Sequence, residues 1–137
     1  MKRLLLSLII LVLLVPAGAQ EFIGLSEKNI RRTIAAENPG LTPDNSVRND
    51  VFRYLKYHSV DDNETWLIFL DDIGRCNGVR ITYGIGGYDS RIRELNEKYE
   101  PSGLNRWTYR SGWNVVEVSV KRDDWFFTVT HSLFRHL

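Results

Sequence analysis

Cysteine is nearly absent from this sequence, since Cys76 is the only one among 137 residues. A single thiol cannot close a disulfide within the chain, so the core must supply the stability that cross-links would otherwise add. We expect Cys76 to be a small buried residue on a strand. A reactive or intermolecular thiol is the alternative, and it would need a basic and exposed setting.

Net charge is nearly absent as well. The full chain has a formal charge of +1. Without Lys2 and Arg3 its 18 basic residues become 16, against 17 acidic ones, which leaves −1. A chain so close to neutral is a poor match for nucleic acid or for an anionic lipid surface. We therefore expect neither a nucleic-acid partner nor general adhesion to membranes.

The sequence also lacks the familiar motifs of catalytic and cofactor sites. Its three histidines are too few and too scattered for a zinc pattern, and no serine stands in a G-x-S-x-G turn. The glycines at 84, 86 and 87 do not form G-x-G-x-x-G, and a flexible strand-to-helix turn explains them more simply. We predict no catalytic residues, no metal and no cofactor.

The N-terminus has the three parts of a secretory signal peptide. Met1-Lys2-Arg3 is basic, Leu4–Val15 is apolar apart from Ser7, and Ala17-Gly18-Ala19 follows a proline. The apolar run is shorter than the ~20 residues of a membrane span, so we expect cleavage after Ala19, with a retained N-terminal anchor as the alternative. The prediction is a periplasmic or secreted protein whose mature chain, residues 20–137, is one domain.

The most apolar stretch of the mature chain is Trp66–Leu70, which is bounded by polar turns. Five consecutive apolar residues of β-favouring types are typical of a strand that is buried on both faces. We therefore expect this segment to be the centre of a sheet.

The remaining pattern predicts two helices and six strands. The first helix covers Leu25–Asn38 and has a good N-cap at Ser26, and the second helix covers Tyr88–Tyr99. Residues 39–50 have loop composition. The predicted strands are 51–59, 66–70, 76–83, 106–110, 114–121 and 125–132. The fold class is α+β: one strongly bent antiparallel sheet of about six strands with both helices on one face, in the order α-β-β-β-α-β-β-β.

This order of elements is compatible with an internal duplication. At an offset of 62 residues Ile30-Arg31 aligns with Ile92-Arg93, and with a small gap Trp66 falls near Trp125. The layout resembles small exported bacterial domains of the PepSY-like or β-lactamase-inhibitor-like kind. The resemblance lies in element order alone, and it implies no activity.

An acidic cluster is the weak metal candidate. Asp61, Asp62 and Glu64 stand together with Asn63 between two predicted strands, and such oxygens are calcium ligands. Their spacing does not match the twelve-residue calcium loop, and aspartates at a hairpin tip also serve turn formation and solubility. The turn is the favoured interpretation.

The candidate binding segment is Arg106–Trp113. It contains Arg106, Trp107, Tyr109, Arg110 and Trp113, which are residue types that dominate binding hot spots. On a strand, Trp107 and Tyr109 share one face and the two arginines share the other. If the aromatic face meets the helices it is core, and this is the favoured alternative. If it meets solvent, it forms a patch for a protein or a glycan.

These observations favour a non-enzymatic binding or interaction domain with a protein or glycan partner in the cell envelope or outside the cell. Two alternatives stay open. One is a small metal-dependent or hydrolytic enzyme that uses Asp61, Asp62 or His58. The other is a structural subunit of an envelope assembly, which includes a homodimer joined along a sheet edge.

Overall fold

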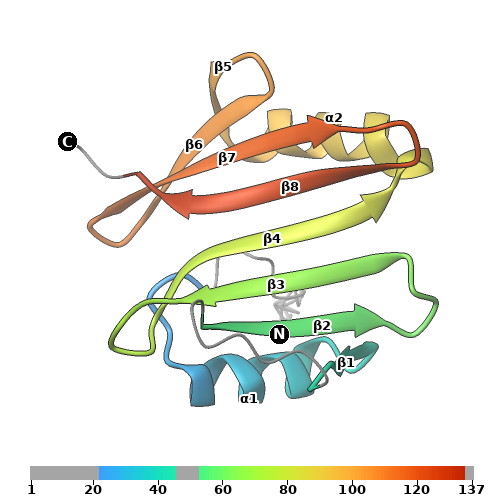
Figure 1. The fold of residues 1–137 in the computed structure, drawn as a ribbon. Coiled ribbons are helices and arrows are strands. Elements are labelled where there is room, and N and C mark those ends of the chain that lie inside the picture. The colour runs from blue at the N-terminus through green and yellow to red at the C-terminus, as the bar shows by residue number, and fades with distance from the viewer. Residues whose placement is uncertain (1–21, 46–52, 135–137) are drawn as a thin grey trace, which may run out of the picture.

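The computed structural model describes residues 22–45 and 53–134, and it has one eight-stranded antiparallel sheet with two α-helices (Figure 1). The predicted signal peptide and the start of the predicted strand 51–59 lie outside the described residues. The elements in chain order are α1 (Glu27–Glu37), β1 (Leu41–Pro43), β2 (Tyr54–Ser59), β3 (Glu64–Leu70), β4 (Cys76–Gly84), a 3-10 turn η2 (Ile85–Gly87), α2 (Tyr88–Lys98), β5 (Glu100–Gly103), β6 (Arg106–Ser111), β7 (Asn114–Arg122) and β8 (Phe126–Leu133).

Both helices form where the sequence predicts them. The Ser26 side chain caps α1 by accepting a hydrogen bond from the Asn29 backbone N–H at 3.4 Å. Ile30 and Ile34, four residues apart, are the buried face of α1, and Leu95 is the buried residue of α2. Within the described ranges, no helix combines the length and the apolarity that a membrane span requires.

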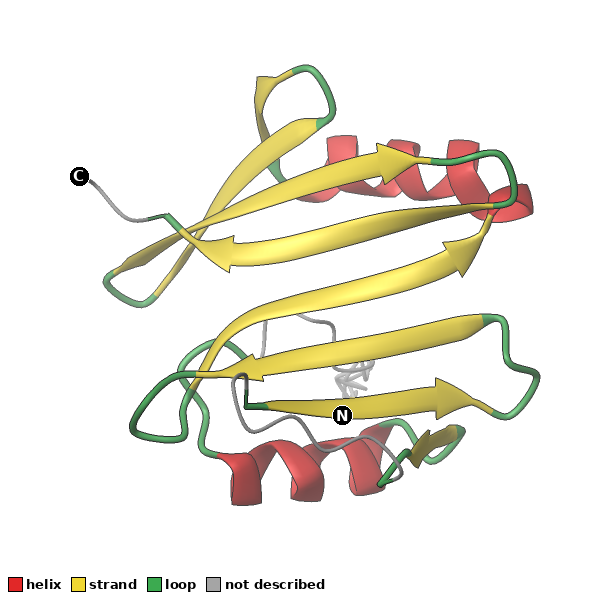
Figure 2. Ribbon diagram, in the orientation of Figure 1, coloured by secondary structure: helices red, strands yellow, loops and turns green. Residues whose placement is uncertain are grey.

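The strands are ordered β1-β2-β3-β4-β8-β7-β6-β5 across the sheet. The central pair is β4 with β8, which runs in register from Gly78 opposite Ser132 to Gly84 opposite Phe126. Each half of the sheet has its own helix, α1 for β1–β4 and α2 for β5–β8 (Figure 2). The order α-β-β-β-β therefore occurs twice along the chain.

The sheet has eight strands, so the prediction of about six strands in the order α-β-β-β-α-β-β-β is wrong. The two missed strands are β1 and β5, the outermost strands of the sheet. β1 ends at Pro43 and β5 contains Pro101, and proline normally argues against a strand. Proline is tolerated at a sheet edge because an edge strand pairs on one side only. The predicted strong bend stays a prediction.

The segment Trp66–Leu70 is buried on one face rather than on both, which corrects a second prediction. Trp66 and Ile68 are buried, whereas Leu67, Phe69 and Leu70 are only half-buried. The strand is third from its edge, and the sheet's centre is the β4–β8 pair. The apolar run looked two-sided because its second face carries apolar residues without a helix over them.

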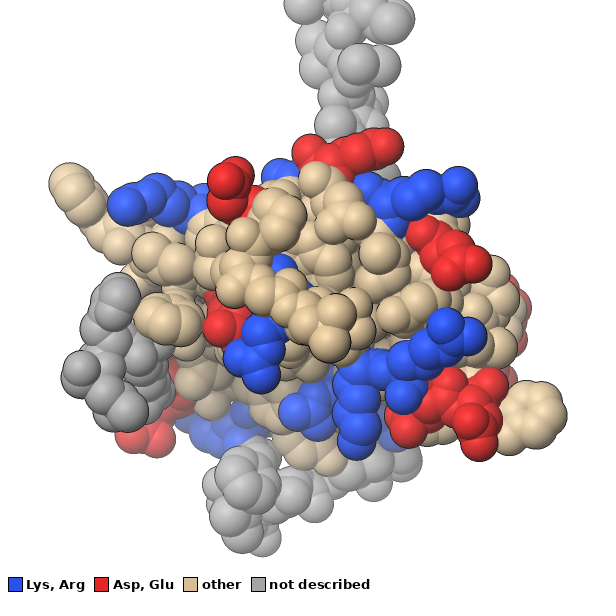
Figure 3. Space-filling model, turned by 90° about the horizontal axis from the view of Figure 1, so that it is seen from above, with Lys and Arg blue, Asp and Glu red and all other residues tan. Residues whose placement is uncertain are grey.

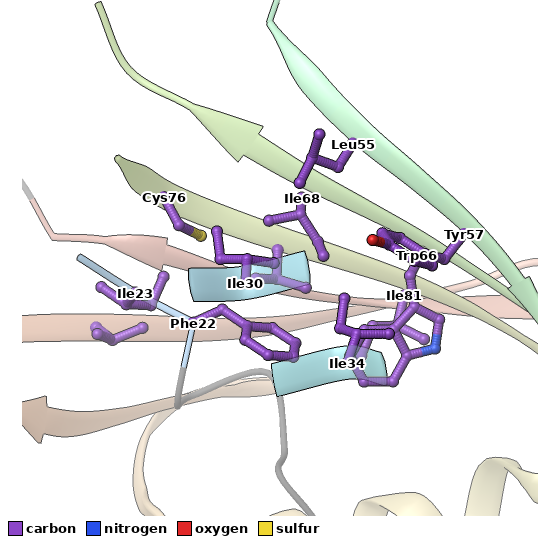
Figure 4. Packing of buried hydrophobic residues seen from close by; sticks show 12 residues of the cluster. Phe22, Ile23, Ile30, Ile34, Leu55, Tyr57, Trp66, Ile68, Cys76 and Ile81 are labelled. Atoms are coloured by element: carbon purple, nitrogen blue, oxygen red, sulfur yellow. The ribbon is translucent and has the colours of Figure 1, made fainter. Parts of the chain in front are cut away.

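The side chains that pack beneath the helices all come from one face of the sheet. Trp66 pairs with Ile81, Ile81 with Val129, and Val129 with Val120, so these four side chains form one row across the sheet. One hydrophobic cluster lies beneath α1, where the labelled side chains surround Ile30 and Ile34 (Figure 4). A second cluster packs with Leu95 of α2. Both helices thus cover the same face, as predicted.

The predicted match between Trp66 and Trp125 is wrong. Trp66 is buried in β3, whereas Trp125 lies in the turn before β8 and is 82% exposed. By order in each half, β3 corresponds to β7 and β4 to β8. The repeated order of elements is a property of the fold, and a duplication of the gene stays a prediction.

Candidate functional site

The candidate site is the face of the sheet opposite the two helices, which we call the open face. Its positions follow from the register: Lys56, Leu67, Arg80, Thr130 and Ser119 form one row across five strands. These side chains point away from the row of Trp66 and its partners because successive residues of a strand face opposite ways. All five are half-buried or exposed, so no described element covers them.

The two halves of the open face differ in chemistry. The half built by β2–β4 carries aromatic, aliphatic and basic side chains, among them Tyr54, Leu67 and Phe69. The half built by β6–β8 is rich in hydroxyl groups from Thr108, Ser119, Thr128, Thr130 and Ser132. Threonine suits solvent-facing strand positions, so the hydroxyl groups alone do not indicate a ligand.

Basic side chains outnumber acidic ones at the strand positions of the open face. The five basic residues are Lys56, Arg80, Arg106, Arg110 and Lys121, and the two acidic residues are Glu100 and Glu117. Glu117 lies 3.5 Å from Arg106, and Asp44 reaches Lys56 from the β1 edge at the same distance. Viewed from above, by contrast, the surface mixes both signs (Figure 3). The basic excess belongs to one face of a nearly neutral protein.

A hollow of about 390 Å³ opens on this face at Gly78. A side chain there would crowd its base, because a Cβ on Gly78 would lie 3.2 Å from the His131 carbonyl oxygen and 3.8 Å from the Phe69 ring. The Arg80 guanidinium lies over that ring, 5.5 Å from its centroid, and Thr130 and Ser132 complete the polar wall. Within the described chain no carboxylate pairs with Arg80. A cation on an aromatic ledge beside hydroxyl groups suits a carboxylate ligand.

The predicted binding segment is divided between two faces, as its alternation predicted. Arg106 and Arg110 are exposed on the open face. Trp107 is buried beneath α2 and its Nε1 donates to Asn96 Oδ1 at 2.9 Å. Tyr109 is half-buried on the same side, and Trp113 is fully exposed in the β6–β7 turn. The five residues do not form one surface, and the two arginines are the part that joins the candidate site.

The acidic metal candidates do not converge. Asp61 is bound within its own turn, where it accepts hydrogen bonds from Ser59 Oγ at 2.7 Å and from Asn63 Nδ2 at 2.8 Å. These hydrogen bonds lower the pKa of Asp61 to about 2. Glu64 instead accepts from the Trp66 indole on the helix side. Among the described residues no three histidine, cysteine or acidic side chains are grouped as metal ligands would be.

For the enzyme alternative, the structure shows one relevant contact, between His58 and Asp44. His58 Nε2 lies 2.8 Å from Asp44 Oδ2, rather than near Asp61 or Asp62. Within the described residues no hydroxyl or thiol is hydrogen-bonded to His58, and a nucleophile activated by this histidine would need such a contact. Cys76 is buried as predicted, and burial raises its pKa to about 11, which keeps the thiol protonated.

A buried polar cluster lies on the helix side where the two hydrophobic clusters meet. The Tyr109 hydroxyl oxygen lies 3.0 Å from His131 Nδ1, and the Tyr99 ring stacks on the Tyr109 ring with centroids 4.5 Å apart. Burial, and to a smaller extent Lys98, lowers the pKa of His131 to about 4. The ring is therefore neutral near pH 7, and its position in the core indicates a structural role.

Sequence reasoning missed the residues of the hollow. Gly78, Phe69 and Arg80 lie in segments that the sequence predicts as strands, and one signal in the sequence points to a further role. A glycine inside a strand pattern marks a bulge or a close approach of another group. The pairing of Gly78 with β8, which decides between these, is visible only in the fold.

No protein-family model, curated protein or solved structure matches this chain. The resemblance in element order to small exported bacterial domains therefore stays a prediction.

Proposed function

We propose that this protein is an exported, non-enzymatic binding domain and that an acidic segment of a partner protein docks on its open face. The observation that carries the proposal is the excess of five basic over two acidic residues at the strand positions of that face. Opposite charge steers a partner to such a face and selects against basic partners.

The hollow at Gly78 supplies an anchor within this face. Arg80 is the arginine that borders the hollow, and arginine is among the residues that carry most of the energy of protein interfaces. A carboxylate that enters the hollow exchanges water for the guanidinium and for the neighbouring hydroxyl groups. We expect Arg80 to contribute more to binding than the peripheral Arg110.

The sheet edges are poorer docking sites than the open face. Both edge strands are short and both contain a proline, Pro43 in β1 and Pro101 in β5. Short, proline-containing edges resist the addition of another strand. This supports docking on the face over a homodimer joined along an edge.

The test uses poly-L-glutamate as the probe and a charge-matched pair of variants. Arg80→Glu/Arg110→Glu changes two open-face residues, and Arg32→Glu/Arg93→Glu makes the same change of net charge on exposed sites of α1 and α2. At physiological ionic strength, charges more than ~8 Å from the probe are largely screened. We expect the open-face variant to lose roughly tenfold or more in affinity, and the helix variant to change little.

Two results would contradict the proposal. One is an equal loss of affinity in both double variants, because binding would then follow net charge alone. The other is tighter binding of duplex DNA or heparin than of poly-L-glutamate at the same ionic strength. That result would point to a nucleic acid or a sulfated glycan.

A further inference from the structure

A second hollow, of about 380 Å³, lies at one end of the sheet and is separate from the open face. The β2–β3 turn, the end of β4 and the start of α2 meet at this end (Figure 1). Its charged lining residues are Glu64 at the start of β3 and Arg91 in α2. The sequence motifs and the proposed docking face leave this hollow without a role.

Two packed aromatic rings, Tyr83 and Phe127, hold the walls of the hollow in place. Tyr83 is directly opposite Glu64 in the β3–β4 register, and it stacks on Phe127 with ring centroids 5.2 Å apart. The Arg91 guanidinium lies over the Tyr83 ring, 4.3 Å from its centroid. Tyr83 therefore contacts the cation through its ring and neighbours the residue of the anion through the strand register.

Glu64 and Arg91 are held by other residues rather than by each other. Glu64 Oε2 accepts a hydrogen bond from Trp66 Nε1 at 3.0 Å, and Arg91 Nη1 donates to Glu94 Oε2 at 2.9 Å. The ion pairs among the described residues do not include one between Glu64 and Arg91. Each has further donor or acceptor capacity, because a carboxylate has two oxygens and a guanidinium has five N–H groups.

We propose that this hollow binds a small zwitterion, with its ammonium group on Glu64 and its carboxylate on Arg91. The volume is within the range of small-molecule sites, and Gly84, Gly86 and Gly87 in the lining leave room for the short aliphatic part of such a ligand. A polyanion would be repelled by Glu64, and a simple amine would meet Arg91. One cation and one anion in the same hollow select a ligand that carries both charges.

The Trp66 indole is a built-in reporter for this site. Its N–H donates to Glu64, so a ligand that binds Glu64 will shift the indole resonance in a ¹H–¹⁵N spectrum. The probes are ω-amino acids from glycine to 6-aminohexanoate together with dialanine, which vary the separation of the two charges. Propylamine and propionate are the single-charge controls. We expect at least one zwitterion to bind at millimolar or lower concentration, and both controls to bind roughly tenfold or more weakly.

Variants separate this site from general charge effects. Glu64→Gln keeps an acceptor for the indole, and Arg91→Lys keeps the positive charge without the planar guanidinium. Each is expected to weaken binding roughly tenfold, whereas Glu97→Gln and Arg93→Lys on the exposed side of α2 should not change it. An unchanged indole resonance in unliganded Arg91→Lys, Glu97→Gln and Arg93→Lys confirms that Trp66 keeps its setting, and a circular dichroism spectrum like that of wild type confirms that Glu64→Gln is folded.

The proposal is overturned if no zwitterion shifts the Trp66 resonance at millimolar concentration. It is also overturned if propylamine or propionate binds as tightly as the best zwitterion, or if binding survives in both Glu64→Gln and Arg91→Lys. None of these results depends on poly-L-glutamate binding, so this site and the open face can fail independently.

Discussion

At the scale of single residues, burial decides the chemistry of the groups that look reactive in the sequence. His131 is 5% exposed and Cys76 is 1% exposed, and both are neutral near pH 7 as a result. Burial also raises the pKa of Tyr109, whose hydroxyl contacts His131. The charged side chains that a partner can reach are instead surface residues such as Arg80, which matters because it borders the hollow on the open face.

His131 makes stability depend on pH. Its pKa is lowered from 6.5 to about 4 in the folded protein, so between these values the unfolded chain binds a proton that the folded protein does not. The contribution of neutral, buried His131 to the free energy of unfolding is therefore fully present above pH 6.5 and is lost as the pH drops towards 4. The loss from this one group is on the order of 3 kcal/mol at its largest.

Urea unfolding at a series of pH values measures this effect, with His131→Gln as the control. The difference in unfolding free energy between the two proteins cancels the shared carboxylate contribution. We expect wild type to lose more stability than the variant as the pH falls. Parallel pH profiles would show that His131 does not titrate with the predicted shift.

At the scale of elements, local pattern and sheet position act together. β3 has a continuous apolar run, yet Ile68 is fully buried while its neighbour Leu67 faces the uncovered side. The proline-containing strands β1 and β5 close the two edges of the same sheet. Whether an apolar residue stabilises the fold thus depends on which face of its strand it occupies.

The two faces of β3 predict a contrast between neighbouring substitutions. Ile68→Ala removes a fully buried side chain beneath α1 and should lower the unfolding free energy by about 2–5 kcal/mol. Leu67→Ala acts on the open face and should cost roughly 1 kcal/mol or less. Chemical denaturation of both variants measures the difference. Similar losses would mean that the open face is covered in the folded protein.

At the scale of the whole molecule, two helix-and-four-strand halves are joined through the antiparallel β4–β8 pair. Tyr83 and Tyr109 pack against both hydrophobic clusters, so side chains as well as backbone hydrogen bonds connect the halves. The arrangement leaves one broad face of the sheet without a helix. This is the surface on which we propose that an acidic partner docks.

Export is the prediction that concerns the complete chain. Residues 1–19 have the composition of a signal peptide, so the full chain expressed in a bacterial host should be exported and processed. Mass spectrometry of the mature protein should find Gln20 at its N-terminus. Replacing Leu8 and Leu11 by Arg interrupts the apolar segment and should leave unprocessed protein in the cytoplasm. Cytoplasmic accumulation of the unaltered chain at full length would contradict this prediction.

Features that depend on neighbouring residues follow from the sequence alone. These are the Ser26 cap of α1, the placement of Cys76 at the start of a buried strand, and the alternation that separates Trp107 from Arg106. Helix capping and the two-residue period of a strand act over a few positions, so they can be read directly.

Which face of the sheet the helices cover, and the pairing of β4 with β8 at its centre, follow from the folded chain and not from local pattern. The same holds for the hollow that Gly78 opens beside Arg80, and for the contact of His58 with Asp44. These features join segments far apart in the chain, and the pairing of distant strands depends on the packing of the whole sheet. Local periodicity indicates that each strand has two faces, but which face stays uncovered depends on where the helices pack.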